Sequence, residues 1–305
     1  MYRWIAAAVA GFICAVPVAA AEPASPLTSL VTGDDSRGWE AVGRLNIGSS
    51  GFCTGAMIAP DLVLTAAHCL FDKDTMRQVN AGQIEFLAGW RNGRATAYRD
   101  VRRAFLHPEY EYNGREGDLR VVNDLALLEL ERPIQTSNVT PFRTAERPRK
   151  GDQVGVVSYA HDRMDRPALE KECQVLARQS GSLILSCSVD FGSSGAPIFT
   201  MDGETPRIVS VVSAKAEVRG RPVSLGTALE KPLAELLALR DNAEPVEIAA
   251  DEPQARHNGS RAQKLRPVGI AGLVHDNASC LRLISGDFHG FSVVSQCQKF
   301  SQRLF

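Results

Sequence analysis

A strand-like apolar run that ends at a histidine and a cysteine constrains this chain more than any other stretch. The run is Leu62–Thr65, and two alanines separate it from His68 and Cys69. A second cysteine, Cys53, lies upstream in a Phe-Cys-Thr-Gly-Ala segment. The pattern indicates an imidazole on a short turn that a disulfide holds in place. Taken alone, it also fits a buried histidine beside a structural disulfide.

Two later segments supply the partners that such an imidazole needs for nucleophilic chemistry. Asp124 leads into the alternating apolar run 125–130, and Ser194 lies in a Gly-Ser-Ser-Gly-Ala-Pro segment whose glycines let the backbone turn sharply. Each segment alone is weak, because aspartate at a strand start is commonly a turn residue. His68, Asp124 and Ser194 in this order, each in its own context, indicate a serine nucleophile with its base.

These segments resemble the histidine, aspartate and nucleophile segments of the trypsin/chymotrypsin family of serine proteases, and of its bacterial secreted branch. The resemblance covers about Leu30 to Arg240. It implies an all-β fold of two six-stranded antiparallel β-barrels, chymotrypsin-like, with a C-terminal helix and a small disulfide-containing extension. His68 and Asp124 would come from the first barrel and Ser194 from the second, with the site in the cleft between them.

The resemblance also implies a secreted serine endopeptidase that works through an acyl-enzyme intermediate. A serine hydroxyl needs a base to take its proton as it attacks, and His68 suits that task. Asp124 would hold the imidazole tautomer, while the backbone N–H groups of Gly192 and Ser194 would form the oxyanion hole. Ser213 leads the strand that lines the family's substrate cleft and can hydrogen-bond Asp124. The alternative is a non-catalytic protein of the protease fold that binds partners through the cleft or its C-terminal module.

Several positions depart from the pattern of the best-known family members. Ser193 stands where zymogen-type members carry an aspartate that pairs with a newly freed N-terminus. Asp190 replaces a common cysteine, and Ser188, which aligns with the pocket floor, is not the aspartate of trypsin-type enzymes. The Ser-Ser-Gly-Ala-Pro form is more similar to the glutamyl-endopeptidase-like branch, although Val212 occupies the place of that branch's pocket histidine.

The expected specificity pocket has a small and apolar lining. No carboxylate stands at the floor position, so cleavage after Arg or Lys is disfavoured, because their charge would be buried unpaired. A medium-sized uncharged residue before the scissile bond is favoured. An acidic residue is the alternative, if the Lys215 ammonium turns inward rather than extending into solvent. The expected lining residues are Ser188, Val189, Val212, Ser213, Ala214 and Lys215.

The charge balance argues against one broad class of partner. The 305 residues include 34 Lys+Arg and 35 Asp+Glu, so no global field favours nucleic acid. Hydrophobic residues make up 44% of the chain, which is ample for more than one barrel. The lack of a CxxC pair or of clustered histidines argues against a metal site. No cofactor is expected, and the expected partner is a polypeptide substrate.

The first 21 residues have the features of a signal peptide. Arg3 supplies a positive start, an apolar stretch runs from Trp4 to Val18, and an A-x-A cleavage site precedes Glu22. Pro17 and the small residues argue against the alternative, an uncleaved membrane anchor, so no membrane span is expected in the mature chain. The protein is therefore expected to be secreted or periplasmic.

Loss of the signal peptide removes Cys14 and leaves six cysteines. An even number of cysteines in an exported chain points to an oxidising compartment and up to three disulfides. Sequence proximity suggests the pairs Cys53–Cys69, Cys173–Cys187 and Cys280–Cys297.

Composition divides the mature chain into parts. Residues 22–29 are expected to be an unstructured leader and residues 30–240 the protease domain, with its two barrels connected near 144–151. Residues 241–264 have few large apolar side chains and are expected to be a linker. Residues 265–305 form a small C-terminal module that is either stapled by Cys280–Cys297 or docked on the barrels.

Periodicity gives a coarse secondary structure within the protease domain. A helix is predicted at Lys231–Arg240, where Pro232 suits the first turn and leucines form an apolar stripe. The polar, Gly-rich stretch 110–118 is expected to be a surface loop. Strands are predicted at 83–88, 98–104, 154–159 and 207–213.

Overall fold

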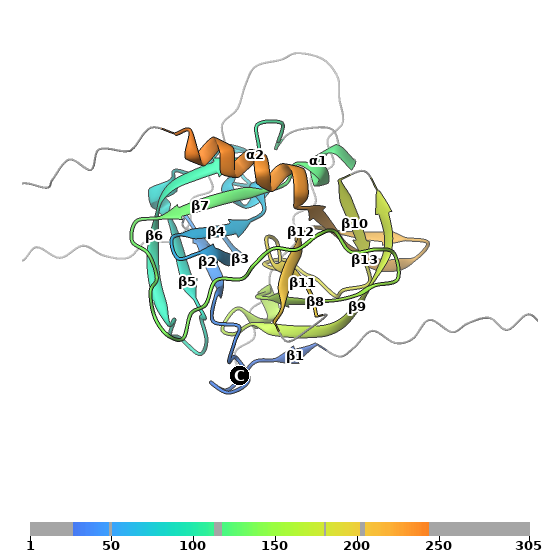
Figure 1. The fold of residues 1–305 in the computed structure, drawn as a ribbon, viewed down its shortest axis with the longest axis horizontal. Coiled ribbons are helices and arrows are strands. Elements are labelled where there is room, and N and C mark those ends of the chain that lie inside the picture. Colours follow the sequence, from blue (N-terminus) through green and yellow to red (C-terminus); the bar gives the residue numbers. More distant parts are fainter. Residues whose placement is uncertain (1–26, 49–50, 113–117, 180, 202–204, 244–305) are drawn as a thin grey trace, which may run out of the picture. The chain divides into compact units, whose positions relative to one another are not determined.

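The computed structural model describes residues 27–48, 51–112, 118–179, 181–201 and 205–243, and these contain two β-barrels (Figure 1). The first is a closed antiparallel barrel with the strand order β2-β3-β4-β7-β6-β5. Its strands are β2 (Val42–Ile47), β3 (Gly51–Ala59), β4 (Leu62–Thr65), β5 (Ile84–Ala88), β6 (Ala97–Leu106) and β7 (Ala126–Leu130).

The second barrel also has six antiparallel strands. Its order is β9-β10-β13-β12-β11-β8, and an additional pairing of β8 with β9 closes it. The strands are β8 (Gln153–Ser158), β9 (Ala168–Gln179), β10 (Ser182–Leu185), β11 (Pro197–Thr200), β12 (Arg207–Val218) and β13 (Arg221–Ala228). The expected pair of six-stranded antiparallel barrels is therefore confirmed.

A short strand β1 (Thr28–Ser29) precedes both barrels and pairs with Leu169 and Ala168 of β9. Next to it, the Leu30 N–H donates to the carbonyl oxygen of Pro167 at 2.9 Å. The expectation of an unstructured leader is wrong for its last two residues, because their backbone groups add an edge strand to the second barrel.

Helices are few in the described part of the chain. The predicted C-terminal helix is α2 (Glu230–Asp241), which begins one residue earlier and ends one residue later than expected. It lies against β6 and β7 of the first barrel (Figure 1), and Leu233 and Leu236 are buried there. A short helix, α1 (Asp118–Val122), begins where a surface loop was expected to end. No helix among the described residues is long and apolar enough to cross a membrane.

Two clusters of buried side chains form the cores, and strands β4, β7 and β11 are buried along their whole length. One cluster fills the first barrel and continues into the second through Tyr159 and Phe199, which are fully buried. A further cluster of aliphatic side chains fills the rest of the second barrel. The Tyr159 hydroxyl donates to the carbonyl oxygen of Trp90, after β5, at 2.7 Å. This bond joins the two barrels beside the predicted site.

The structure contains the Cys53–Cys69 and Cys173–Cys187 disulfides that sequence proximity suggested. Cys280 and Cys297, like the expected signal peptide and C-terminal module, lie outside the described residues. Of the expected linker 241–264, only residues 241–243 are described, and Asp241 belongs to α2.

Candidate active site

His68 lies in a short 3-10 helix, η1 (Ala67–Leu70), directly after β4. The disulfide from the next residue, Cys69, to Cys53 on β3 ties this turn to the first barrel. The His68 side chain is 21% exposed, so one edge of the ring faces solvent. A metal is not held by the two neighbouring sulfurs, because they are bonded to each other.

Asp124 lies between α1 and β7, and its side chain is 3% exposed. Its Oδ1 accepts the His68 backbone N–H at 2.8 Å, and its Oδ2 is 2.7 Å from His68 Nδ1. The Ser213 hydroxyl also donates to Oδ2, as the sequence suggested. A carboxylate only accepts, so the geometry assigns the proton of a neutral imidazole to Nδ1 and leaves Nε2 as an acceptor.

Ser194 lies in the turn between Asp190 and β11 of the second barrel. Hydrogen bonds from the first barrel fix the position of this turn. The Thr54 N–H, on β3, donates to the Ser194 carbonyl oxygen, and the Thr54 hydroxyl donates to the Gly192 carbonyl oxygen, both at 2.9 Å. Thr54 is fully buried, so these bonds are shielded from water. They fix the serine segment from the side of the barrel that carries His68.

Both glycines of this turn are required by their backbone geometry. Gly192 has φ +96°, and a Cβ there would lie 2.4 Å from the Phe52 ring. Gly195 has φ +78°, and a Cβ there would lie 2.1 Å from Thr65 Oγ1. No side chain fits at either position, because the backbone conformation and the available space both exclude it.

Two backbone N–H groups of the turn have no acceptor among the described residues. The N–H groups of Ser193 and Gly195 bond to the carbonyl oxygens of Asp190 and Val212, whereas those of Gly192 and Ser194 do not donate to any described group. The carbonyl oxygen of Phe191 accepts the His161 N–H at 2.7 Å, which directs the Gly192 N–H to the opposite side of that planar peptide. These two donors are therefore available to an external acceptor.

A cavity of about 780 Å³ brings the predicted residues together. His68, Asp124 and Ser194 line it, together with five of the six residues expected in the specificity pocket. These five are Val189, Val212, Ser213, Ala214 and Lys215. Ser188 is not among the lining residues; its side chain is exposed, and its N–H donates to Glu170 Oε2 at 2.8 Å.

The cavity also has walls that the sequence did not indicate. Lys73, Tyr110 and Tyr112 come from loops of the first barrel, and Arg120 lies on α1, which connects β6 to β7 and packs against β10 and β13 of the second barrel. No periodic pattern marks these segments. Phe71 stacks on Tyr112 with ring centroids 4.5 Å apart, behind this aromatic wall. The remaining lining residues are Val121, Asp190, Phe191, Ala216 and Leu225.

Two titratable side chains that line the cavity, Tyr110 and Asp190, have shifted pKa values. Burial, reinforced by the nearby Asp124, raises the pKa of Tyr110 far above its usual range, so its hydroxyl stays neutral. The Phe191 N–H and the Lys215 ammonium hold the pKa of Asp190 below its usual range. Lys215 Nζ lies 3.5 Å from Asp190 Oδ1, with both side chains about half exposed. The lysine therefore extends along the rim and does not provide a buried cation.

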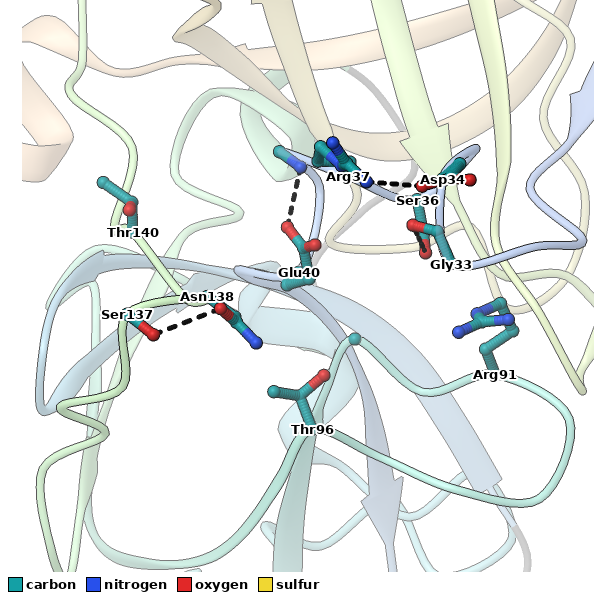
Figure 2. A pocket seen from close by; sticks show the side chains of 12 residues that line it. Gly33, Asp34, Ser36, Arg37, Glu40, Arg91, Thr96, Ser137, Asn138 and Thr140 are labelled. Carbon is teal, nitrogen blue, oxygen red and sulfur yellow. Dashed lines mark hydrogen bonds and ion pairs between the residues drawn. The ribbon is translucent and has the colours of Figure 1, made fainter.

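A second cavity of about 630 Å³ is lined by none of the predicted site residues (Figure 2). Two pairs of its polar side chains bond to each other within the wall. Arg37 pairs with Asp34 at 2.5 Å, and the Ser137 hydroxyl donates to Asn138 at 3.2 Å. With these groups occupied by one another, the second cavity has no feature of a reactive centre.

Comparisons with known proteins identify the fold and the family. Among solved structures, a Glu endopeptidase in complex with MPD superposes with a TM-score of 0.60 at 16% identity, covering 73% of this chain and 99% of that one. At this identity the likeness shows the fold alone.

Curated relatives include three insect proteins. A modular serine protease of Drosophila melanogaster is 38% identical over 93 residues, covering 28% of this chain and 14% of that protein. A trypsin of Sarcophaga bullata is 31% identical over 103 residues (33% and 36%), and venom serine protease 34 of Apis mellifera is 24% identical over 185 residues (52% and 44%). The chain spans less than half the length of each. These insect relatives lend no support to the bacterial glutamyl-endopeptidase-like branch, which stays a prediction.

The sequence profile of the Trypsin family matches residues 31–228, which contain both barrels and every residue of the candidate site. Since this match covers more than half of the chain, the protein belongs to the trypsin family of serine proteases.

Proposed function

We propose that the protein is a serine endopeptidase in which Ser194 is the nucleophile, His68 the general base and Asp124 the group that orients the base. The observation that carries the proposal is the 2.7 Å contact of His68 Nδ1 with a buried Asp124 carboxylate, in a cavity that Ser194 also lines. The contact fixes the tautomer with a free Nε2, which is the form that can accept a proton from serine.

The chemistry follows from these positions. Ser194 Oγ attacks the substrate carbonyl carbon and gives its proton to His68 Nε2. The negative charge that develops on the carbonyl oxygen is received by the N–H groups of Gly192 and Ser194, which have no acceptor within the described chain. His68 then protonates the leaving amine, and water hydrolyses the acyl-enzyme by the same steps in reverse roles.

The position of Asp124 beside the imidazole stabilises the protonated form of His68 that arises during the reaction. When His68 takes the proton it becomes an imidazolium, and the carboxylate at 2.7 Å stabilises that charge. Three donors, the His68 N–H, the His68 ring and the Ser213 hydroxyl, provide the buried carboxylate with hydrogen bonds. The two disulfides suit an oxidising compartment, and we infer that the protein acts outside the cytoplasm.

Activity-based labelling tests the proposal. A fluorophosphonate probe should label the wild-type protein at Ser194, and Ser194→Ala should lose both labelling and peptide hydrolysis while keeping the circular dichroism spectrum of the wild type. Ser137→Ala, an exposed serine in the second cavity, is the matched control and should keep both. Undiminished hydrolysis by Ser194→Ala would end the assignment. A folded wild type that neither reacts nor hydrolyses peptides would favour the non-catalytic binding protein.

A further inference from the structure

The exposed charges around the cavity are predominantly positive. Three cationic side chains line it, Lys73, Arg120 and Lys215, and two carboxylates, Asp124 and Asp190. Asp124 is buried and engaged by His68 and Ser213, so it is not available to a substrate side chain. Asp190 is the one lining carboxylate that is exposed, and it faces Lys215.

Lys73 and Arg120 are the cations that lack a counter-charge. Both are exposed, and neither makes an ion pair with a described residue. The Lys73 ammonium lies 5.6 Å from the centre of the Phe191 ring, at the cavity. The neighbouring carboxylate of Asp72 accepts from the Asp74 N–H, the Thr75 N–H and the Thr75 hydroxyl, and so belongs to the turn.

The cations stand on both barrels. Lys73 comes from a loop of the first barrel, Arg120 from α1, which packs against β10 and β13 of the second barrel, and Lys215 from β12 of the second. The chain as a whole is nearly neutral, with a formal charge of −1, so this positive lining is a local feature of the cavity. An extended peptide placed against Ser194 therefore has a positively charged side chain on either side of it.

We propose that the cavity selects polypeptides that carry Asp or Glu close to the cleaved bond. This rests on the proposed peptidase function and concerns residues flanking the bond, outside the apolar pocket. Carboxylates there would gain from Lys73 and Arg120, and the exposed Lys215–Asp190 pair is weak enough to exchange partners. A predominantly positive rim acts on the rate of association and on discrimination between substrates, and salt screens both effects.

Matched fluorogenic peptides test the proposal. One peptide carries Glu at two flanking positions, and its partner carries Gln at the same positions, with one uncharged residue before the scissile bond in both. The ratio of their kcat/KM values should be ~3–10 at low ionic strength and should approach 1 at high salt. The ratio should fall in Lys73→Gln and in Arg120→Gln. Lys171→Gln, an exposed lysine on β9 outside the cavity, should leave it unchanged.

The two proposals fail in different ways. Hydrolysis of both peptides with a ratio near or below 1 overturns the charge preference and leaves the peptidase function standing. If the wild type hydrolyses neither, the proposed function fails. Equilibrium binding of the same two peptides, by fluorescence anisotropy, then decides whether the cavity prefers the acidic one. Equal binding would reject the preference in that case as well.

Discussion

The Ser193 hydroxyl lies 3.1 Å from the carbonyl oxygen of Tyr159, to which it donates, and it is fully buried. It also accepts the Asp190 N–H at 3.3 Å. The Tyr159 N–H donates in turn to the Thr54 hydroxyl, which holds the Gly192 carbonyl oxygen. Neutral hydrogen bonds thus hold the loop before Ser194, at the position where zymogen-type relatives use an aspartate.

The first prediction concerns the N-terminus. A hydroxyl cannot form an ion pair with a freed ammonium group, so activity should not depend on where the chain is cut. Chains starting at Glu22 and at Leu30 should have kcat/KM values within about twofold of each other, since the shorter one loses the β1 pairing on β9 but keeps all the strands of both barrels. A large gain on trimming to Leu30 or Val31 would show that the new N-terminus orders the loop by another route.

The second prediction tests the backbone donors. Gly192→Ala should lower kcat by ~10²–10³, the usual cost of losing one oxyanion donor, because the new Cβ meets the Phe52 ring and displaces the peptide. The matched control is Gly93→Ala, which has φ +81° but no atom within 4 Å of its Cβ. It carries the same backbone strain without the contact, and should keep kcat. Equal losses in both variants would mean that strain alone explains the effect.

The third prediction uses a buried carboxyl near the cavity. Burial raises the pKa of Glu170, and the Ser188 N–H and Arg163 offset this only in part. The protonated Glu170 carboxyl group therefore contributes stability that is fully present below its ordinary pKa of 4.5, which applies to the unfolded chain. This contribution is lost as pH rises through the raised pKa of the folded protein. Glu170→Gln should therefore have a higher free energy of unfolding than the wild type at pH 8, by about 1 kcal/mol, and the advantage should vanish near pH 4.

Urea unfolding at the two pH values measures this difference. Glu172→Gln, an exposed glutamate on the same strand, is the control and should change stability little at either pH. If Glu170→Gln were destabilising at pH 8, the ionised carboxylate would have to be stabilised by a group not apparent among the described residues.

The parts of the site that sequence could predict are those whose chemistry is local. The His-Cys turn, the aspartate before an apolar strand and the Gly-bounded serine each carry their own pattern, and Ser213 follows from its place in the family. Arg120, on α1, and Tyr112, in the loop before it, could not be predicted as cavity walls, because these segments approach the site only through tertiary packing. The hydrogen bonds from Thr54 to the Gly192 and Ser194 carbonyl oxygens depend on contact between the two barrels. No pattern along a single strand predicts such a contact.

Secondary structure likewise divides into elements that a local pattern predicts and elements that depend on tertiary contacts. The helix ending at Asp241 was predicted because its leucines recur at helical spacing, whereas five-residue α1 is too short for a period to be seen. Strand β12 extends to Val218, beyond the predicted Ser213. Residues 214–218 alternate between apolar and charged side chains, but Ala, Lys and Glu are depleted in strands, so their composition did not indicate one. β1 was missed because its two residues gain their strand conformation from β9 alone.

The fourth prediction concerns the covalent framework. Peptide mapping of the full chain without reduction should recover Cys53–Cys69 and Cys173–Cys187, and we expect Cys280–Cys297 as the third pair. Breaking the second pair by a double Cys→Ala substitution should cost ~3 kcal/mol, from the loop-closure entropy of a short loop. A peptide that joins Cys187 to Cys280 would instead show that the C-terminal module is stapled to the protease domain.

The last prediction is the residue before the scissile bond. The inner lining of the cavity is apolar, with Val189, Val212 and Leu225 beside Ala214 and Ala216. Its one exposed carboxylate, Asp190, is at the rim and faces Lys215, so an Arg or Lys side chain placed among the valines would lose its hydration without a partner. A peptide library should therefore be cleaved after medium-sized uncharged residues in preference to basic ones.

Two outcomes would revise this assignment in different ways. A profile dominated by Arg or Lys would mean that a basic side chain reaches a carboxylate beyond the lining, and Glu170, behind the exposed Ser188, is the one to substitute first. A profile dominated by Glu that disappears in Lys215→Ala would make Lys215 a specificity residue that leaves Asp190 when substrate binds. The uncharged preference predicts that Lys215→Ala changes the profile little, because the exposed lysine at the rim does not enter the apolar part of the cavity.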